Sequence, residues 1–226
     1  MKENVFRRQL ESLSGCCEFL DYQAAVSLIK SGDVNCNVPK VAFTFDDGFD
    51  DCSEYIAPVL NEFGIKGCFF INPNFCLGSE SYRKEFSERA VLLPGKLPME
   101  VAQVRKLADQ GHVIGAHTMD HALLLSNDDD FLVDQIVHCK RAVESISEKK
   151  CDDFAWTYGG YKHISQKAID LALSCYGNVL SSDNHHYYLG NDGENLSVIN
   201  RRHFEPYWPS SHVKYFLSKK KSSYKV

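Results

Sequence analysis

The sequence predicts an α/β domain in which short buried strands alternate with amphipathic helices. Segments rich in valine, isoleucine and phenylalanine at residues 41–43, 65–72 and 112–116 are separated by stretches with helical spacing of apolar side chains. This alternation is typical of βα units. The length of 226 residues suits one domain with a full-sized core, and no repeat or linker divides the chain. We therefore expect a single domain over residues 1–226.

Helix boundaries follow from residues that start or stop helical turns. Asp50 is a candidate N-cap and Pro98 can open a helix, while Gly64 and Gly111 each follow a helical stretch. In chain order we expect a strand at residues 41–43, a helix at 50–63, a strand at 65–72, a helix at 98–110, a strand at 112–116, a helix at 128–147, a strand at 153–156, a helix at 165–175, and strands at 178–181 and 196–204.

Composition argues against a nucleic-acid partner and against a transmembrane segment. The formal net charge is −5 and the sequence pI is about 6.0, and the one basic run, Lys219 to Lys221, is interpreted as a solvated tail. The first residues show no signal-peptide pattern. No stretch of about 18 consecutive apolar residues is present that could span a bilayer.

The cysteines indicate a reducing compartment. Nine are present, an odd number, and none belongs to a CxxC pair, so a zinc–thiolate site is not expected. Unpaired thiols are typical of the cytosol, and we expect a cytoplasmic protein. They are Cys16, Cys17, Cys36, Cys52, Cys68, Cys76, Cys139, Cys151 and Cys175.

Two adjacent acids follow the first buried strand, in the string Thr44-Phe45-Asp46-Asp47-Gly48. A carboxylate near a low-dielectric interior must be paired, hydrogen-bonded or bound to a metal, or it takes up a proton. Gly48 permits a sharp turn at this point. Alone, the string is more typical of a solvated acidic turn after a strand.

Two histidines follow a second buried strand, in the string His117-Thr118-Met119-Asp120-His121. Residues four apart lie on the same side of a helical turn, so both imidazoles would reach one ion. Because the acid pair and the histidine pair both come at strand ends, together they predict a metal site.

The two strings together resemble the signature of the polysaccharide deacetylases, a group of metal-dependent carbohydrate esterases that includes the chitooligosaccharide deacetylases. The resemblance covers roughly residues 6–205. Residues 6–32 are similar to the segment before the acid motif in many members. Residues 50–72 resemble the helix and strand that follow it, and residues 111–121 resemble the histidine motif with its lead-in.

The resemblance implies a fold and a set of roles. The fold is a distorted (β/α) barrel with about seven strands, in which the loops at the C-terminal ends of strands carry the chemistry. Asp47, His117 and His121 would bind one divalent ion, and Asp46 would be the general base. Zinc suits this ligand set, although iron, cobalt or nickel would also fit.

The sequence identifies a third motif and the general acid less clearly than the first two motifs. Residues 154–159 resemble the next family motif, which usually has proline where this chain has Thr157. There the backbone N–H near Tyr158 would bind the substrate oxyanion, and Trp156 would stack on a sugar ring or simply pack in the core. His203 is the preferred general acid. The alternatives are His185 and His186, which a surface loop would also explain.

The polar stretch at residues 73–97 predicts a long loop above the catalytic face. It would form a wall of the substrate groove. Its basic residues, Arg83, Lys84 and Arg89, would meet an anionic sugar or form a solvated face, and His112, inside an apolar strand, is expected to be a core residue.

These observations favour a metal-dependent enzyme that removes an N-acetyl or formyl group from an amino sugar or oligosaccharide. Glycan metabolism or surface-polysaccharide biosynthesis would supply the substrate. A related hydrolase of another non-peptide C–N bond would use the same site with a different pocket. A degenerate member would keep the barrel only as a binding module, but the intact acid and histidine strings argue against this reading.

Overall fold

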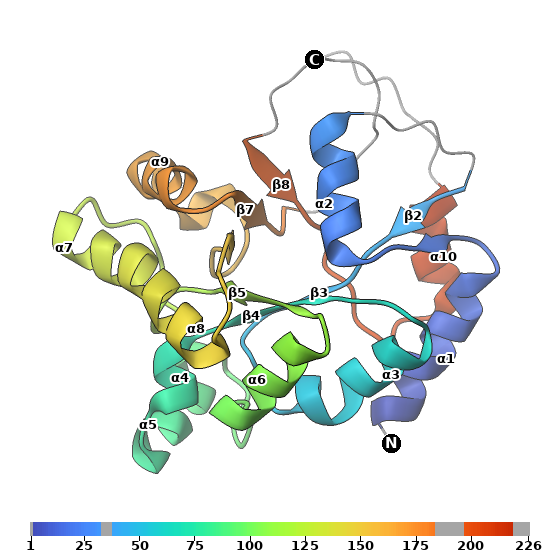
Figure 1. Cartoon of the computed structure of the whole chain (residues 1–226), viewed down its shortest axis with the longest axis horizontal. Helices are drawn as coiled ribbons and strands as arrows, with labels where there is room; N and C mark the ends of the chain where they lie inside the picture. The colour runs from blue at the N-terminus through green and yellow to red at the C-terminus, as the bar shows by residue number, and fades with distance from the viewer. Residues whose placement is uncertain (1, 33–37, 184–196, 219–226) are drawn as a thin grey trace.

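The computed structural model describes residues 2–32, 38–183 and 197–218, and it has an open, curved parallel sheet at its centre. Six strands follow one another in chain order across the sheet, and every neighbouring pair is parallel (Figure 1). They are β3 (Thr44–Phe45), β4 (Cys68–Ile71), β5 (Val113–Ala116), β6 (Asp153–Ala155), β7 (Asn178–Ser181) and β8 (Val198–Asn200).

The predicted distorted barrel is confirmed, with six strands in its main sheet where the sequence led us to expect about seven. A separate parallel pair, β1 (Glu18–Phe19) and β2 (Lys40–Val41), lies just before β3 in the chain. Within the described ranges β3 and β8 form the two edges of the sheet and do not pair with each other. The barrel therefore has an open seam between its first and last strands.

Helices surround the sheet (Figure 1). The first and last, α1 and α10, lie side by side, and the Gln9 amide of α1 donates to the Trp208 carbonyl just before α10. The helices are α1 (Lys2–Ser14), α2 (Tyr22–Ser31), η1 (Cys52–Ile56) with α3 (Ala57–Glu62), α4 (Pro73–Leu77), α5 (Glu80–Glu85), η2 (Phe86–Ala90), α6 (Val101–Asp109), α7 (Asp129–Leu132) with η3 (Val133–His138) and α8 (Cys139–Ser147), η4 (Tyr161–His163), α9 (Gln166–Cys175) and α10 (Ser210–Ser218).

Local sequence explains these elements. All four residues of β4 are buried, as expected of a parallel strand covered on both faces. The Ser165 hydroxyl accepts a hydrogen bond from the Ala168 N–H and starts α9, while Glu100 and Gln103 form a capping box at α6. Gly64 ends α3 with a φ of 70°.

The structure corrects two sequence expectations. The stretch at residues 73–97, predicted to be a loop, contains α4, α5 and η2, because Pro73 and Ser79 each start a helix there. We call residues 73–97 the cap segment. The helix predicted from Pro98 begins three residues later, since Pro98 itself forms an isolated bridge with Phe49.

No described helix is long and apolar enough to cross a membrane. The eight cysteines within the described residues are free thiols, and Cys36 lies outside those residues.

Candidate metal centre and active site

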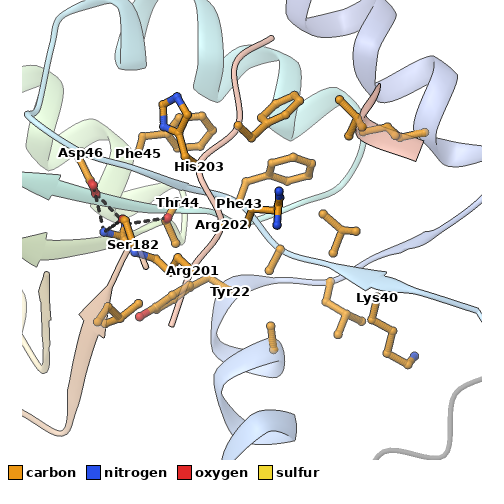
Figure 2. Close-up of a pocket in the computed structure, with 18 of the residues that line it drawn as sticks. Tyr22, Lys40, Phe43, Thr44, Phe45, Asp46, Ser182, Arg201, Arg202 and His203 are labelled. Atoms are coloured by element: carbon orange, nitrogen blue, oxygen red, sulfur yellow. Dashed lines mark hydrogen bonds and ion pairs between the residues drawn. The ribbon is translucent and has the colours of Figure 1, made fainter. Parts of the chain in front are cut away.

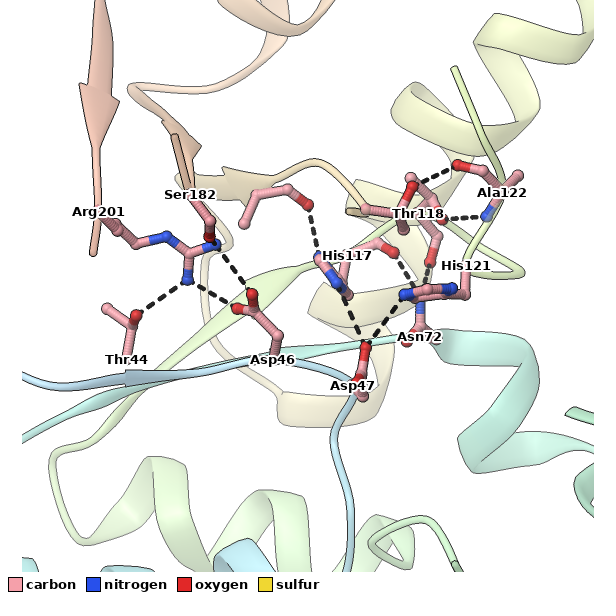
Figure 3. A network of polar contacts seen from close by, with 12 residues as sticks. Thr44, Asp46, Asp47, Asn72, His117, Thr118, His121, Ala122, Ser182 and Arg201 are labelled. Atoms are coloured by element: carbon pink, nitrogen blue, oxygen red, sulfur yellow. Dashed lines mark hydrogen bonds and ion pairs between the residues drawn. The ribbon is translucent and has the colours of Figure 1, made fainter. Parts of the chain in front are cut away.

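The predicted metal ligands, Asp47, His117 and His121, meet at the C-terminal ends of two strands (Figure 3). Asp46 and Asp47 follow β3, His117 follows β5, and the turn with Tyr158 follows β6. Parallel strands end at the same edge of a sheet, so residues about 70 positions apart in the chain become neighbours.

One carboxylate oxygen of Asp47 faces both histidines. Its Oδ1 lies 3.4 Å from His117 Nε2 and 3.3 Å from His121 Nε2. A tetrahedral ion with ligands at about 2.0–2.1 Å requires ligand atoms about 3.3–3.4 Å apart, so the spacing fits a zinc-like centre. Asp47 Oδ1 is buried and accepts no hydrogen bond from the described residues. The donor set therefore matches a divalent cation.

The histidine string is a loop and not the predicted helical turn. Thr118 and His121 have φ values of 64° and 55°, in the left-handed region that side chains with a Cβ rarely adopt. Asp47 (69°) and Tyr158 (61°) share this conformation. Strained backbone of this kind persists only where surrounding contacts enforce it, and it concentrates at functional sites.

Backbone contacts fix the orientation of His117. Its Nδ1–H donates to the Ala155 carbonyl at 2.7 Å, which leaves the Nε2 lone pair directed at Asp47. The Asn72 amide donates to the carbonyls of His117 and Thr118 (Figure 3). Burial lowers the pKa of His117, but the charges of Asp46 and Asp47 outweigh it, and the net pKa is raised. The site thus attracts positive charge.

Asp120, between the two histidines, ties this loop to its surroundings. Its Oδ1 accepts hydrogen bonds from Asn74 Nδ2 at 2.7 Å and from the Tyr82 hydroxyl at 2.6 Å, and its Oδ2 accepts from Gln135 Nε2 at 2.9 Å. Asn74 and Tyr82 belong to the cap segment, and Gln135 belongs to η3. One carboxylate therefore holds three helices, α4, α5 and η3, against the histidine loop.

Asp46 points away from the histidines and forms a bidentate ion pair with Arg201 (Figure 3). The Arg201 Nη1 and Nη2 atoms lie 2.7 and 2.9 Å from the two carboxylate oxygens, and the guanidinium also donates to Thr44 and Ser182. Burial raises the pKa of Asp46, but the Arg201 charge and hydrogen bonds outweigh it and hold the pKa below its ordinary value. Asp46 is therefore ionised at neutral pH.

A pocket of about 290 Å³ opens over these groups. Its polar side contains Asp46, Asp47, His117, His121, Ser182 and His203, and its apolar side contains Ala90, Val91, Leu92 and Tyr158, with Gly159 beside them. The structure thus brings His203 to the metal pocket, where its ring is more than half exposed and its Nε2 lies 3.2 Å from Glu205 Oε1. His185 and His186 lie outside the described residues.

The third motif departs from one expectation. Trp156 has no accessible surface and its indole N–H donates to the Gly160 carbonyl, so it packs in the core and the predicted sugar stacking is wrong. Thr157 is also buried, and its hydroxyl donates to the Ala122 carbonyl at 2.6 Å, which links this motif to the histidine loop. The exposed ring of Tyr158 lies 4.9 Å from that of His121.

Two further expectations are confirmed. His112 is buried, its Nδ1 accepts a hydrogen bond from the Gly67 N–H, and burial lowers its pKa to about 4, so it is a neutral core residue. Arg89 pairs with Glu85 on the exposed surface, as expected of a solvated face, whereas Arg83 is partly buried, pairs with Glu100 and donates to the Cys76 carbonyl.

Sequence reasoning missed the partners that hold the site. In the sequence, Asp120 stands out only as part of the histidine string, and no local pattern marks Ser182 or Leu92 or assigns Arg201 to its partner. A long-range contact such as Arg201–Asp46, 155 positions apart, leaves no trace in local periodicity. The sequence did contain one clue to this contact. Two adjacent acids at a buried strand end require a nearby cation.

Comparisons with known proteins agree with this fold. A sequence profile described as "Polysaccharide deacetylase" matches residues 33–174, which is more than half of the chain. No curated protein sequence matches the chain.

Three solved structures show the same fold at low sequence identity. The Streptococcus pyogenes deacetylase PplD in complex with acetate superposes with a TM-score of 0.74 at 15% identity, covering 96% of this chain and 87% of that one. IcaB from Ammonifex degensii gives 0.72 at 19% identity, with 96% and 89% covered. A de-N-acetylase from Aggregatibacter actinomycetemcomitans gives 0.68 at 17% identity, with 93% and 86% covered. From the profile match, with the fold in agreement, the chain belongs to the polysaccharide deacetylase family.

Proposed function

We propose that this protein is a metal-dependent hydrolase that removes an N-acetyl or formyl group from an amino sugar, in glycan metabolism or surface-polysaccharide biosynthesis. The observation that carries the proposal is the convergence of Asp47, His117 and His121 on one point beside an ionised Asp46. The names of the similar solved structures, a deacetylase and a de-N-acetylase among them, support this reaction class.

Asp47, His117 and His121 would hold one divalent ion, for which zinc is our first choice. Such an ion polarises an acyl carbonyl and makes water more acidic. Asp47 contributes negative charge, and the Ala155 carbonyl keeps the His117 ring in the tautomer that presents Nε2.

Asp46 would accept the proton of the attacking water. Its paired Arg201 fixes the carboxylate and keeps it ionised, so the base is ready at neutral pH. Tyr158 also lines the pocket, and its backbone N–H would donate to the oxyanion as the acyl carbon becomes tetrahedral. His203 would return a proton to the departing amine.

The cap segment would determine which sugar enters. Leu92, in the wall of the pocket, is about three-quarters exposed and has a φ of 56°. We propose an amino sugar small enough to fit between Leu92 and Tyr158. The cytoplasmic location stays a prediction from the cysteine pattern.

Metal analysis combined with acyl-release assays tests the function. Purified protein should contain one equivalent of a divalent metal by elemental analysis and should release acetate or formate from a panel of N-acylated sugars. Chelation should abolish release, and adding zinc should restore it. If the protein binds metal but hydrolyses only small amides or cyclic ureides, it belongs to a different class of C–N hydrolase. Absence of metal and of all hydrolysis would refute the proposal.

A further inference from the structure

A second cavity lies along the open seam of the barrel, between the edge strands β3 and β8 (Figure 2). It encloses about 960 Å³, near the upper end of the roughly 300–1,000 Å³ range of small-molecule sites. Its walls come from α2, the β2–β3 segment, the chain after β8, and α10. We call this space the seam cavity.

The wall of the seam cavity is mostly apolar at the end formed by α2 and α10. Val26, Ile29, Val41, Ile199 and Phe216 contribute to it. Two charged residues of the wall are engaged: Lys40 pairs with Glu18 at 2.6 Å, and the Arg202 guanidinium lies 3.4 Å from the centre of the Phe216 ring. Sugar hydroxyls moved into this part would lose water and find few partners among the residues that the structure describes.

The seam cavity and the metal pocket share four polar residues of their walls. Asp46, Asp47, Ser182 and His203 line both spaces. Figure 2 shows Asp46, Ser182 and His203 at one side of the view and Lys40 at the other. A ligand that fills both spaces would thus need a polar head at the carboxylates and an apolar tail toward α2.

We propose that the seam cavity binds the hydrocarbon chain of an amphiphilic substrate whose amino-sugar head occupies the metal pocket. The inference rests on the proposed function for the identity of the head group, but the apolar subsite is a property of the cavity itself. Polysaccharide made only of sugar units would leave this apolar surface unused. The chain would be carried either by the glycosidic oxygen or by the N-acyl group.

Helix α2 provides a matched pair of variants. Ala25 lines the cavity, whereas its neighbour Ala24 is exposed and does not line it. Ala25→Trp fills the cavity, and Ala24→Trp adds the same side chain to the outside of the same helix. Ile29→Trp provides a second filling variant if Ala25→Trp does not fold.

Binding is measured first with a probe that cannot be hydrolysed. Calorimetry compares n-octyl β-glucoside, kept below its micelle concentration, with methyl β-glucoside. Each buried methylene contributes about fourfold in affinity, so the wild type should bind the octyl compound at least about tenfold more tightly. The filling variants should lose that gain, and Ala24→Trp should keep it. Equal binding of both glucosides by the wild type, or a gain that survives both filling variants, would overturn the proposal.

Kinetics then distinguish the source of the chain and separate this inference from the proposed function. A lower KM for the octyl glycoside of N-acetylglucosamine than for its methyl glycoside supports a glycosidic chain. A lower KM for N-octanoyl than for N-acetyl methyl glucosaminide supports an acyl chain. Selective octyl glucoside binding without hydrolysis of any N-acyl sugar would preserve the seam cavity as a hydrocarbon site and refute the deacetylase proposal.

Discussion

Four residues around the candidate metal centre have left-handed backbone, and none of them is glycine. At Asp47, Thr118, His121 and Tyr158 the chain adopts conformations that cost of order 1–3 kcal/mol each. The Asn72 side-chain amide donates hydrogen bonds to carbonyls of the histidine loop, and the Thr157 hydroxyl donates one to the Ala122 carbonyl. The strained backbone thus lowers the stability of the fold while it orients individual side chains, as expected at a site that binds an ion.

His121→Ala should remove the bound metal and the activity together. The remaining ligands, Asp47 and His117, are too few for a stable site. Elemental analysis of the purified variant measures this. His138→Ala is the control, because His138 is exposed on η3 and pairs only with Asp134 among the described residues. Stoichiometric metal in His121→Ala would show that the ligand assignment is wrong.

Asp46→Asn should lower kcat by about 10²–10⁴ while metal content stays normal, because the amide cannot accept a proton. The substitution preserves the size of the side chain and one oxygen toward Arg201, but it removes the second oxygen of the bidentate pair and its charge. Acyl release measured beside metal content separates the two effects, with exposed Asp170→Asn as a control. Full turnover in Asp46→Asn would exclude it as the general base.

At the scale of elements, local pattern predicted most strands and helices of this fold and two of its site motifs. Strand β7 matches its predicted bounds, and Ser165 starts α9 as its pattern indicates. The helices of the cap segment were missed because its polar residues suggested a loop. The loop form of the His117–His121 string was missed for a different reason. Its shape depends on contacts with Asn72 and Thr157, which are distant in sequence.

Asp120 couples the cap segment to the metal ligands, and Asp120→Ala should weaken metal binding. Although the histidine loop would keep its contacts with Asn72, Ala155 and Thr157, the substitution would release Asn74, Tyr82 and Gln135 at once. Loss of such supporting contacts typically costs 10–100-fold in metal affinity. Competition with a chelator measures the affinity, and Asp120→Asn, which preserves an oxygen acceptor, should recover part of it. Unchanged affinity in Asp120→Ala would mean that the loop is held by its own backbone.

Leu92→Gly should change substrate choice without changing metal content. Glycine adopts a φ of 56° without strain and removes an apolar wall of the pocket. We expect the ratio of kcat/KM for N-butyryl over N-acetyl sugars to rise by roughly tenfold, the scale of a few methylenes in a pocket. Leu97→Gly is the matched control, since Leu97 is exposed on the same segment and does not line the pocket. An unchanged ratio of the two kcat/KM values would mean that the cap segment does not select the substrate.

At the scale of the whole molecule, the open seam is the feature that sequence could not predict. Each strand is predicted separately, but closure of a barrel depends on whether its first and last strands pair. Here β3 and β8 remain edges within the described residues, and α1, α2 and α10 lie along the gap. The same opening that leaves the barrel incomplete provides the seam cavity next to the catalytic carboxylates.

Far from the site, a buried carboxyl links stability to pH. Asp153 on β6 accepts hydrogen bonds at 2.7 Å from the Tyr22 hydroxyl and from Asn178 Nδ2, both on its Oδ1. Burial raises its pKa above the ordinary value of about 3.9, despite these hydrogen bonds. As the pH rises, Asp153 therefore ionises at a lower pH in the unfolded chain than in the folded protein. Stability from the protonated carboxyl is complete below that ordinary value and is lost as the pH rises through the folded pKa.

Asp153→Asn should consequently be near neutral in stability at pH 4 and stabilising at pH 8. Asparagine preserves the oxygen acceptor and cannot ionise. A gain of about 1 kcal/mol at pH 8 would raise Tm by about 2–4 °C in a chain of this size.

The neighbour Asp152 gives a control of opposite sign. The Lys150 amine hydrogen-bonds to it and lowers its pKa, so Asp152→Asn should lose a little stability at both pH 8 and pH 4, and this loss should fade only as the pH falls below the ordinary value of about 3.9 through the folded pKa. Thermal unfolding of both variants across this range measures the difference. A constant Tm offset for Asp153→Asn from pH 4 to pH 8 would show that the buried carboxyl does not titrate differently in the folded protein.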